Sequence, residues 1–172
     1  MRQQISVALG MMAAAIVVAL LFWGPELTWA GRPIGDDVAS RLVWAIRLSL
    51  LPAVCILAAV GVIATRRFFD PRAIGGGLPE PGSALDIDRR VLANTVEQAM
   101  LALPAYAAAA VTLPMEDMPR IGACAMAFVA GRIAFAIGYH IAPPFRAFGF
   151  ALTFYSSAAL YAWLAWELII PH

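Results

Sequence analysis

The sequence predicts an all-α integral membrane protein, and its apolar stretches, composition and length support this prediction. Five long stretches, 5–23, 48–65, 98–115, 121–142 and 147–166, are almost free of charge. A helix needs about 20 apolar residues to cross the hydrocarbon core of a bilayer. The composition is 62% hydrophobic and only 13% charged. A soluble domain of this length has too large a surface for its volume to bury so many apolar side chains.

The first apolar stretch predicts a transmembrane helix over 4–23 that the protein retains. A cleaved secretory signal is the alternative, because an arginine precedes the apolar run. However, the run is longer than the roughly 7–15 residues typical of such signals. Phe22 and Trp23 at its end are typical of anchors at the membrane surface, and Gly24 and Pro25 then predict a loop.

Four further helices are expected, and capping and proline residues mark their ends. Ser40 is the expected N-cap of the next helix, and Arg66 and Arg67 close it, where basic residues interact favourably with the last carbonyls. Pro143 and Pro144 end the fourth helix, because proline cannot continue a helix. The four expected helices cover 40–66, 86–112, 119–141 and 145–170.

The arginines lie unevenly on the two sides of this predicted bundle. One side holds Arg2, Arg66, Arg67, Arg72, Arg89, Arg90 and Arg146, and the other holds Arg32, Arg41 and Arg120. Cytoplasmic flanks of transmembrane helices are rich in basic residues. We therefore expect a multi-pass protein of the bacterial inner membrane, with the N-terminus and the 66–90 loop in the cytoplasm and the C-terminus outside.

Small residues recur every four positions on the fourth expected helix. Such ladders favour close helix packing, either within one subunit or between subunits. The two ladders are Ala123, Ala127 and Gly131, and Ala130, Ala134 and Gly138.

The few polar residues at membrane depth are the candidate functional residues, because ionisable side chains there are costly and face the bundle interior. Arg90, Asn94 and Glu97 have helical spacing and form one stripe on the third expected helix. Arg132 and Tyr139 form a second stripe on the next helix. We expect the two stripes to face each other or a shared cavity.

Arg146 follows the double proline, so it should lie near Tyr139 on the cytoplasmic side. Together with the two stripes it gives an excess of positive charge, and an unpaired buried charge is costly. Guanidinium groups bind carboxylates in a bidentate manner, so this site suits an anionic ligand with several carboxylates. The alternative is that these residues only join helices, for example through a pairing of Arg132 with Glu97.

These residues also resemble the signature of the MAPEG superfamily, the membrane-associated proteins in eicosanoid and glutathione metabolism. The likeness covers about 42–170 and is to the microsomal glutathione transferases in particular. The segment that ends the helix over 40–66 resembles the end of that family's first helix. The matching segments are Arg90-x-x-x-Asn94-x-x-Glu97, Arg132-x-x-x-x-x-Gly138-Tyr139-x-x-x-x-x-x-Arg146, and Ala-Thr-Arg66-Arg67-Phe.

The resemblance implies a four-helix bundle over 42–172 that assembles as a homotrimer, with 1–41 as an additional N-terminal transmembrane helix and loop. It also implies that glutathione, as a co-substrate, binds between neighbouring subunits near the cytoplasmic face, without a metal. The residues implied to bind glutathione are Arg90, Asn94, Glu97, Arg132 and Tyr139, together with Arg66 and Arg67.

Arg146 matches the arginine that lies against the thiol in catalytic members of the family. The thiolate is the nucleophilic form of a thiol, and a nearby guanidinium favours it. The resemblance thus implies a membrane glutathione transferase or peroxidase that acts on a lipophilic substrate arriving through the bilayer. Phe135 and Gln98 depart from the family pattern, because tyrosine is common at both positions.

Two other function classes stay open at this stage. A non-catalytic lipid-binding or scaffold member of the same fold is the main alternative, and Phe135 favours it. A small transporter is disfavoured, because such folds use broken helices at the midplane or inverted repeats. The net charge of +1 gives no basic surface for nucleic acid, and Cys55 and Cys124 lack the spacing of a disulfide or metal site.

Overall fold

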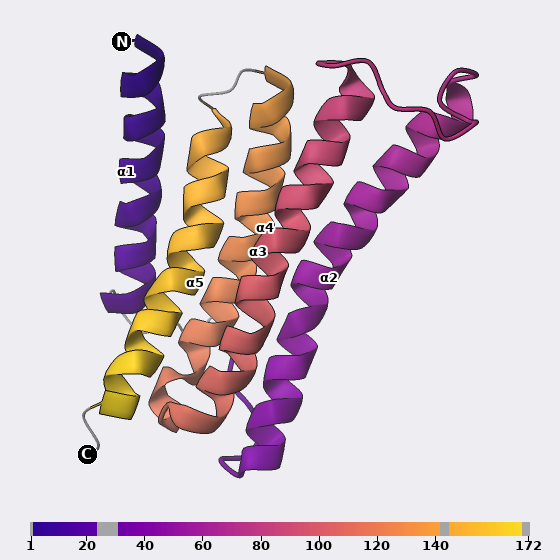
Figure 1. Cartoon of the computed structure of the whole chain (residues 1–172). Coiled ribbons are helices and arrows are strands. Elements are labelled where there is room, and N and C mark those ends of the chain that lie inside the picture. Colours follow the sequence, from indigo (N-terminus) through magenta and orange to yellow (C-terminus); the bar gives the residue numbers. More distant parts are fainter. Residues whose placement is uncertain (1, 24–30, 142–144, 170–172) are drawn as a thin grey trace.

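The computed structural model describes residues 2–23, 31–141 and 145–169, and these fold into a bundle of helices (Figure 1). The helices run alternately up and down, so that α1 begins at one end of the bundle and α5 finishes at the other. Pro143 and Pro144, expected to end the fourth helix, lie outside the described residues. The helices are α1 (Arg2–Trp23), α2 (Val38–Phe69), α3 (Ala84–Thr112), α4 (Met118–Ile141) and α5 (Arg146–Ile169), with a short 3₁₀ turn, η2 (Met115–Asp117).

Four of the described helical segments are long and apolar enough to cross a membrane: Gln3–Trp23, Val38–Phe69, Met115–Ile141 and Arg146–Ile169. The chain is therefore a multi-pass membrane protein. The sequence also predicted a membrane span in α3, but the hydropathy of α3 is too low for the same assignment. Its polar residues Asn94, Glu97 and Gln98 lower it. The helix nevertheless packs along α2, α4 and α5, and these contacts bury Asp88, Thr95 and Gln98 of α3.

The start of α2 differs from the expectation that Ser40 is its N-cap. Asp37 is the cap instead, and its carboxylate accepts hydrogen bonds from the Ser40 backbone N at 3.0 Å and from the Ser40 hydroxyl at 2.5 Å. Asp37 has extended backbone angles, as N-cap residues do. These two hydrogen bonds hold the pKa of Asp37 below its usual value. Ser40 is thus the partner of the cap, and α2 begins earlier than predicted.

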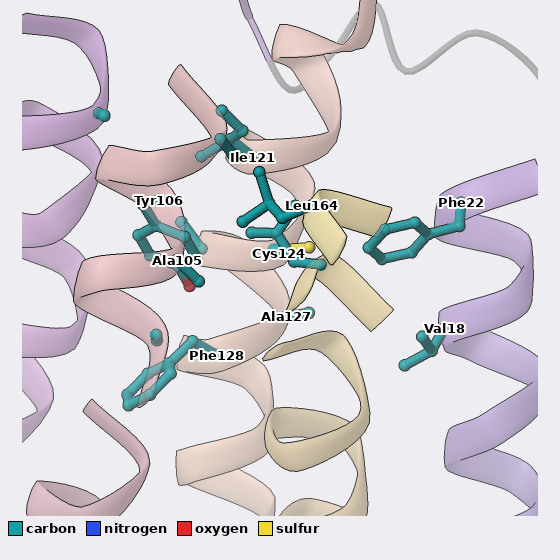
Figure 2. Packing of buried hydrophobic residues seen from close by; sticks show 14 of the residues in the cluster. Val18, Phe22, Ala105, Tyr106, Ile121, Cys124, Ala127, Phe128 and Leu164 are labelled. Carbon is teal, nitrogen blue, oxygen red and sulfur yellow. The ribbon is translucent and has the colours of Figure 1, made fainter. Parts of the chain in front are cut away.

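The core lies between α3, α4 and α5, and α1 packs against it from one side (Figure 2). Tyr106 and Phe128 are among the largest fully buried side chains, and alanines around them let the helices approach closely. Val18 and Phe22 join α1 to this core. Cys124 is a free thiol within it.

Glycines set the close approach of α4 to α5 at the end of the bundle where α1 begins. A Cβ atom on Gly149 would lie 2.3 Å from the Phe135 backbone N, and one on Gly138 would lie 2.7 Å from the Arg146 backbone N. Gly131 likewise faces the Gly149 carbonyl. The glycines of both small-residue ladders therefore serve packing within the chain, and they bring the first turn of α5 against α4.

Candidate functional site

An open pocket of about 340 Å³ lies between α1, α3, α4 and α5. Its residues come from the first turns of α3 and α5 and the last turns of α4, which meet at the end of the bundle where α1 begins (Figure 1). The volume falls in the range of about 300–1,000 Å³ that is usual for small-molecule sites. The lining residues are Met11, Arg90, Asn94, Phe135, Tyr139, Arg146, Ala147 and Phe150.

The polar residues of the pocket come from three different helices, and the sequence analysis proposed them as site residues. Arg90 forms an ion pair with Asp86, with 2.9 Å between Nη2 and Oδ2, and it lines the pocket together with Tyr139. The Tyr139 ring in turn lies under the Arg146 guanidinium, with 4.3 Å between Cζ and the ring centroid. Tyr139 and Arg146 therefore lie in contact at this end of the bundle, as their spacing predicted.

The two arginines differ in how their charge is balanced. The Gly82 backbone N–H donates to the Asp86 carboxylate at 2.9 Å, and this bond, supported by Arg90, holds the pKa of Asp86 below its usual value. Asp86 therefore stays ionised and neutralises Arg90. Arg146 has no carboxylate partner among the described residues, and its guanidinium stacks on the Tyr139 ring. The pocket thus carries one uncompensated positive charge, which suits an anion.

Arg132 lies beneath this surface and is only 4% exposed. Its Nη1 donates to Asn94 Oδ1 at 2.9 Å, and its Nη2 donates to Thr153 Oγ1 at 2.5 Å and to the Gly149 carbonyl at 3.2 Å. Asn94 Nδ2 then donates to Glu97 Oε2 at 3.0 Å. The two polar stripes therefore face each other, as expected. Arg132 reaches Glu97 through Asn94 instead of pairing with it directly.

Phe135 lines the pocket and contacts Arg132, which is not part of the lining. The Arg132 guanidinium lies over the Phe135 ring, with 4.5 Å from Cζ to the centroid. Phe135 in turn meets the Tyr139 ring edge-on at 5.4 Å. A cation over an aromatic face is attracted by the quadrupole of the ring, so Phe135 supports both neighbours although it offers no hydroxyl to a ligand.

Not every residue proposed for the site lies in this pocket. Glu97 is exposed and outside the lining. Arg66 pairs with Asp88, which also contacts His140, with 2.7 Å between His140 Nε2 and Oδ1. Arg66 lines a different pocket, of about 780 Å³, beside the loop between α2 and α3. Arg67 is half-buried, and its Nε has no hydrogen-bond partner in the described part of the chain.

Several residues of the site were not identified by sequence reasoning. Asp86 has a readable signal, because Asp86 and Arg90 are four apart on one helix and opposite charges at this spacing attract. Thr153 and Phe150 lie in an apolar helix with no motif. Met11 belongs to α1, outside the resemblance, and nothing in the sequence relates it to residues 90–146. Only the packing of α1 places it in the pocket.

The comparison with protein families gives one match. A model of the MAPEG family matches residues 44–166, which extend from within α2 to near the end of α5. No curated protein and no solved structure matches the chain. The match contains every candidate polar residue of the pocket and leaves α1 outside.

Proposed function

The chain belongs to the MAPEG family, and on that premise we propose that it is a membrane glutathione transferase or peroxidase. In this proposal glutathione binds in the pocket between α3, α4 and α5, and its sulfur attacks a lipophilic electrophile. The observation that carries the proposal is the position of Arg146. Its guanidinium faces an open pocket, stacks on Tyr139 and has no carboxylate partner among the described residues.

The proposed roles follow from the positions of the polar groups. Arg90, Asn94 and Tyr139 line the pocket and would hold the carboxylates and amide groups of the peptide. Arg132 and Glu97 would act through Asn94, which they contact on either side. Arg66 and Arg67 lie outside the pocket lining, so a role for them requires a neighbouring subunit or movement of the loop between α2 and α3.

Arg146 would supply the chemistry by stabilising the thiolate. A free thiol has a pKa of about 8.5 and is mostly protonated at neutral pH. A guanidinium within about 4–6 Å favours the anion, so the thiol proton passes to water and the sulfur keeps the electron pair. In a transferase reaction this pair forms a bond to an electrophilic carbon. In a peroxidase reaction it forms an S–O bond with a hydroperoxide oxygen as the O–O bond breaks, and the alkoxide that leaves takes a proton from water. The thiol of a second glutathione then converts the sulfenic acid into the disulfide and water.

The proposal extends to assembly and orientation. We propose a homotrimer in the bacterial inner membrane, with the N-terminus in the cytoplasm. Family membership supports the trimer, and the open form of the pocket is what a site completed by a second subunit requires. The arginine bias supports the orientation.

A non-catalytic lipid-binding or scaffold role is the second candidate, and two observations favour it. Phe135 lines the pocket without a hydroxyl group. Nη1 and Nη2 of Arg132 already donate hydrogen bonds to Asn94, Gly149 and Thr153, so these donors are not available to a ligand. A protein of this kind would bind an apolar molecule in the pocket and would not activate a thiol.

The deciding experiment is a glutathione titration of the detergent-purified protein that follows thiolate absorbance. A saturable signal at neutral pH is expected. S-methylglutathione is the matched control ligand, because it has the same peptide but no ionisable thiol, and it should remove the signal by competition. Binding of neither ligand would refute a glutathione site and favour the lipid-binding or scaffold role, and binding of both without thiolate would refute the activation of the thiol by Arg146.

A further inference from the structure

The helix that lies outside the family match contributes a wall to the proposed site. α1 precedes residues 44–166, yet Met11 lines the pocket beside Arg146 and Phe150. Met11 is 39% exposed and its neighbour Met12 is 57% exposed, and Met12 is not part of the lining. Two adjacent residues of the same type therefore differ in whether they reach the pocket.

The position of Met11 is set by contacts along α1. Gly10 faces the first turns of α5, and a Cβ atom there would lie 3.2 Å from the Phe148 backbone N. Further along α1, Val18 and Phe22 are buried against the core (Figure 2). At the end of α1, Arg120 Nε donates to the Phe22 carbonyl at 3.1 Å. Because these contacts lie on both sides of Met11, they fix it over the pocket.

The pocket lining contains two chemically different kinds of residue. Arg90, Asn94, Tyr139 and Arg146 are polar, whereas Met11, Phe135, Ala147 and Phe150 are apolar. The Arg146 guanidinium stacks on the Tyr139 ring, and Ala147 follows Arg146 on α5. A ligand that fits this mixed lining has an anionic part and an apolar part.

We propose that Met11 determines which apolar substrates are accepted, by limiting the space beside the reacting sulfur. This inference rests on the proposed glutathione chemistry and adds a substrate class, electrophiles with an aliphatic chain. The unbranched Met side chain has three rotatable bonds and adapts to irregular apolar shapes, so it suits a flexible chain. On this view α1 is a part of the substrate site that residues 44–166 do not contain.

The test uses straight-chain 2-alkenals of increasing length with glutathione and the full chain in detergent. The thiolate adds to the β-carbon, the electron pair of the C=C bond moves to the α-carbon, and that carbon takes a proton from water. The reaction has no leaving group, and loss of the conjugated absorbance reports the rate. The quantity compared is kcat/KM for a long alkenal divided by kcat/KM for a short one.

Met11→Ala should raise this ratio about tenfold, because a pocket that gains or loses methylene-sized space discriminates by roughly that factor. Met11→Phe should lower the ratio, since it fills the same space. Met12→Ala is the matched control and should leave the ratio at the wild-type value. The absorbance of bound thiolate should be the same in all variants, because Met11 carries no charge.

The outcomes separate the two levels of the proposal. An unchanged ratio in both Met11 variants, with normal turnover, would refute the role of Met11 and leave the glutathione site intact. A change of equal size in Met12→Ala would also refute it. Absence of thiolate and turnover in the wild-type protein would refute the proposed function and the inference with it. If Met11→Ala does not fold, Met11→Phe and the conservative Met11→Leu decide the question.

Discussion

Arg120 and Arg146 stand near opposite ends of the bundle and are used in opposite ways. Arg120 Nε donates to the Phe22 carbonyl at 3.1 Å, its Nη1 pairs with Asp117, and its Cζ lies 5.1 Å from the centroid of the Trp163 ring. Arg146 stacks on the Tyr139 ring and has no ion pair within the described ranges. The arginine at one end of the bundle is held by several protein contacts, whereas the guanidinium of the arginine at the other end is available to a ligand.

This difference separates a structural arginine from a candidate binding arginine. Arg120 joins α1, η2, α4 and α5 through contacts that leave little of its charge for a ligand. Arg41 is similar, because its guanidinium donates to the Leu113 carbonyl at the end of α3. An arginine beside a pocket without such partners keeps its capacity to bind an anion. If this contrast is functional, replacement of Arg146 should change thiolate formation and replacement of Arg120 should change stability.

Replacement of Arg146 should have the largest effect. In Arg146→Ala the pKa of the bound thiol should return to about 8.5, which lowers the ratio of thiolate to thiol by about 100-fold for a change of two pKa units. The signal should return as the pH is raised above that value. Thiolate absorbance against pH in the presence of saturating glutathione measures this shift.

Arg120→Ala is the control for this comparison. It should destabilise the protein, because it leaves the Asp117 carboxylate and the Phe22 carbonyl without their donor, but it should keep the wild-type thiolate midpoint. A shifted midpoint of thiolate formation in Arg120→Ala, or a wild-type midpoint in Arg146→Ala, would contradict the different roles of the two arginines.

Gly149→Ala should disrupt the pocket end through the backbone. The added Cβ would lie 2.3 Å from the Phe135 N and 2.5 Å from the Gly131 carbonyl, and overpacking of this kind costs about 1–3 kcal/mol. Thermal unfolding in detergent should report the loss of stability. Gly61→Ala is the matched control, because no atom lies within 4 Å of its Cβ position, and it should be neutral or stabilising. Equal stability of both variants would contradict the close packing of α4 and α5.

Arg90→Ala should weaken glutathione binding about tenfold, or about 1.4 kcal/mol, because it removes a cation from the lining and leaves Asp86 uncompensated beside the pocket. Isothermal titration calorimetry with S-methylglutathione measures the affinity without the thiol. Arg89→Ala is the control, since Arg89 is exposed and outside the lining. Affinities that fall equally in both variants would indicate a general charge effect.

Thr153→Val should have the smallest effect, on stability. It removes the hydroxyl that accepts from Arg132 at 2.5 Å, and one hydrogen bond is worth about 1 kcal/mol. The midpoint of thiolate formation should not change, because Arg132 lies behind the pocket surface. Ser156→Ala is the control, since the Ser156 hydroxyl donates only to the carbonyl of its own helix at Leu152. A shifted thiolate midpoint in Thr153→Val would bring Arg132 into the site.

Most of the helical architecture was predictable, because it depends on local features of the chain. Long apolar runs predict helices, and the observed bounds differ from the expected ones by only a few residues at most ends. The helical spacing of Arg90, Asn94 and Glu97 correctly placed them on one face, and Asn94 contacts both Glu97 and Arg132. The hydropathy of α3 was overestimated, because its apolar second half was considered without its polar first half.

The site itself was only partly predictable, because a long side chain can reach several partners from distant parts of the sequence, and tertiary packing decides which of them it contacts. Arg66 had a family precedent for the site, but it pairs with Asp88. A direct pairing of Arg132 with Glu97 was an alternative from the sequence, but Arg132 donates to Asn94, Gly149 and Thr153 instead. These pairings depend on distances between different helices, and the periodicity of a single helix does not predict those distances.

By itself, the sequence determined that this chain is a multi-pass helical membrane protein, since an apolar run of sufficient length has no other stable environment. It also determined the family, through the order and spacing of polar residues within 44–166. Only the tertiary structure decided that Arg146 lines the pocket with no carboxylate partner among the described residues, and that Met11 of α1 reaches the same pocket. The physical reason is that the helical repeat sets which residues share a face, whereas packing between helices decides which faces meet.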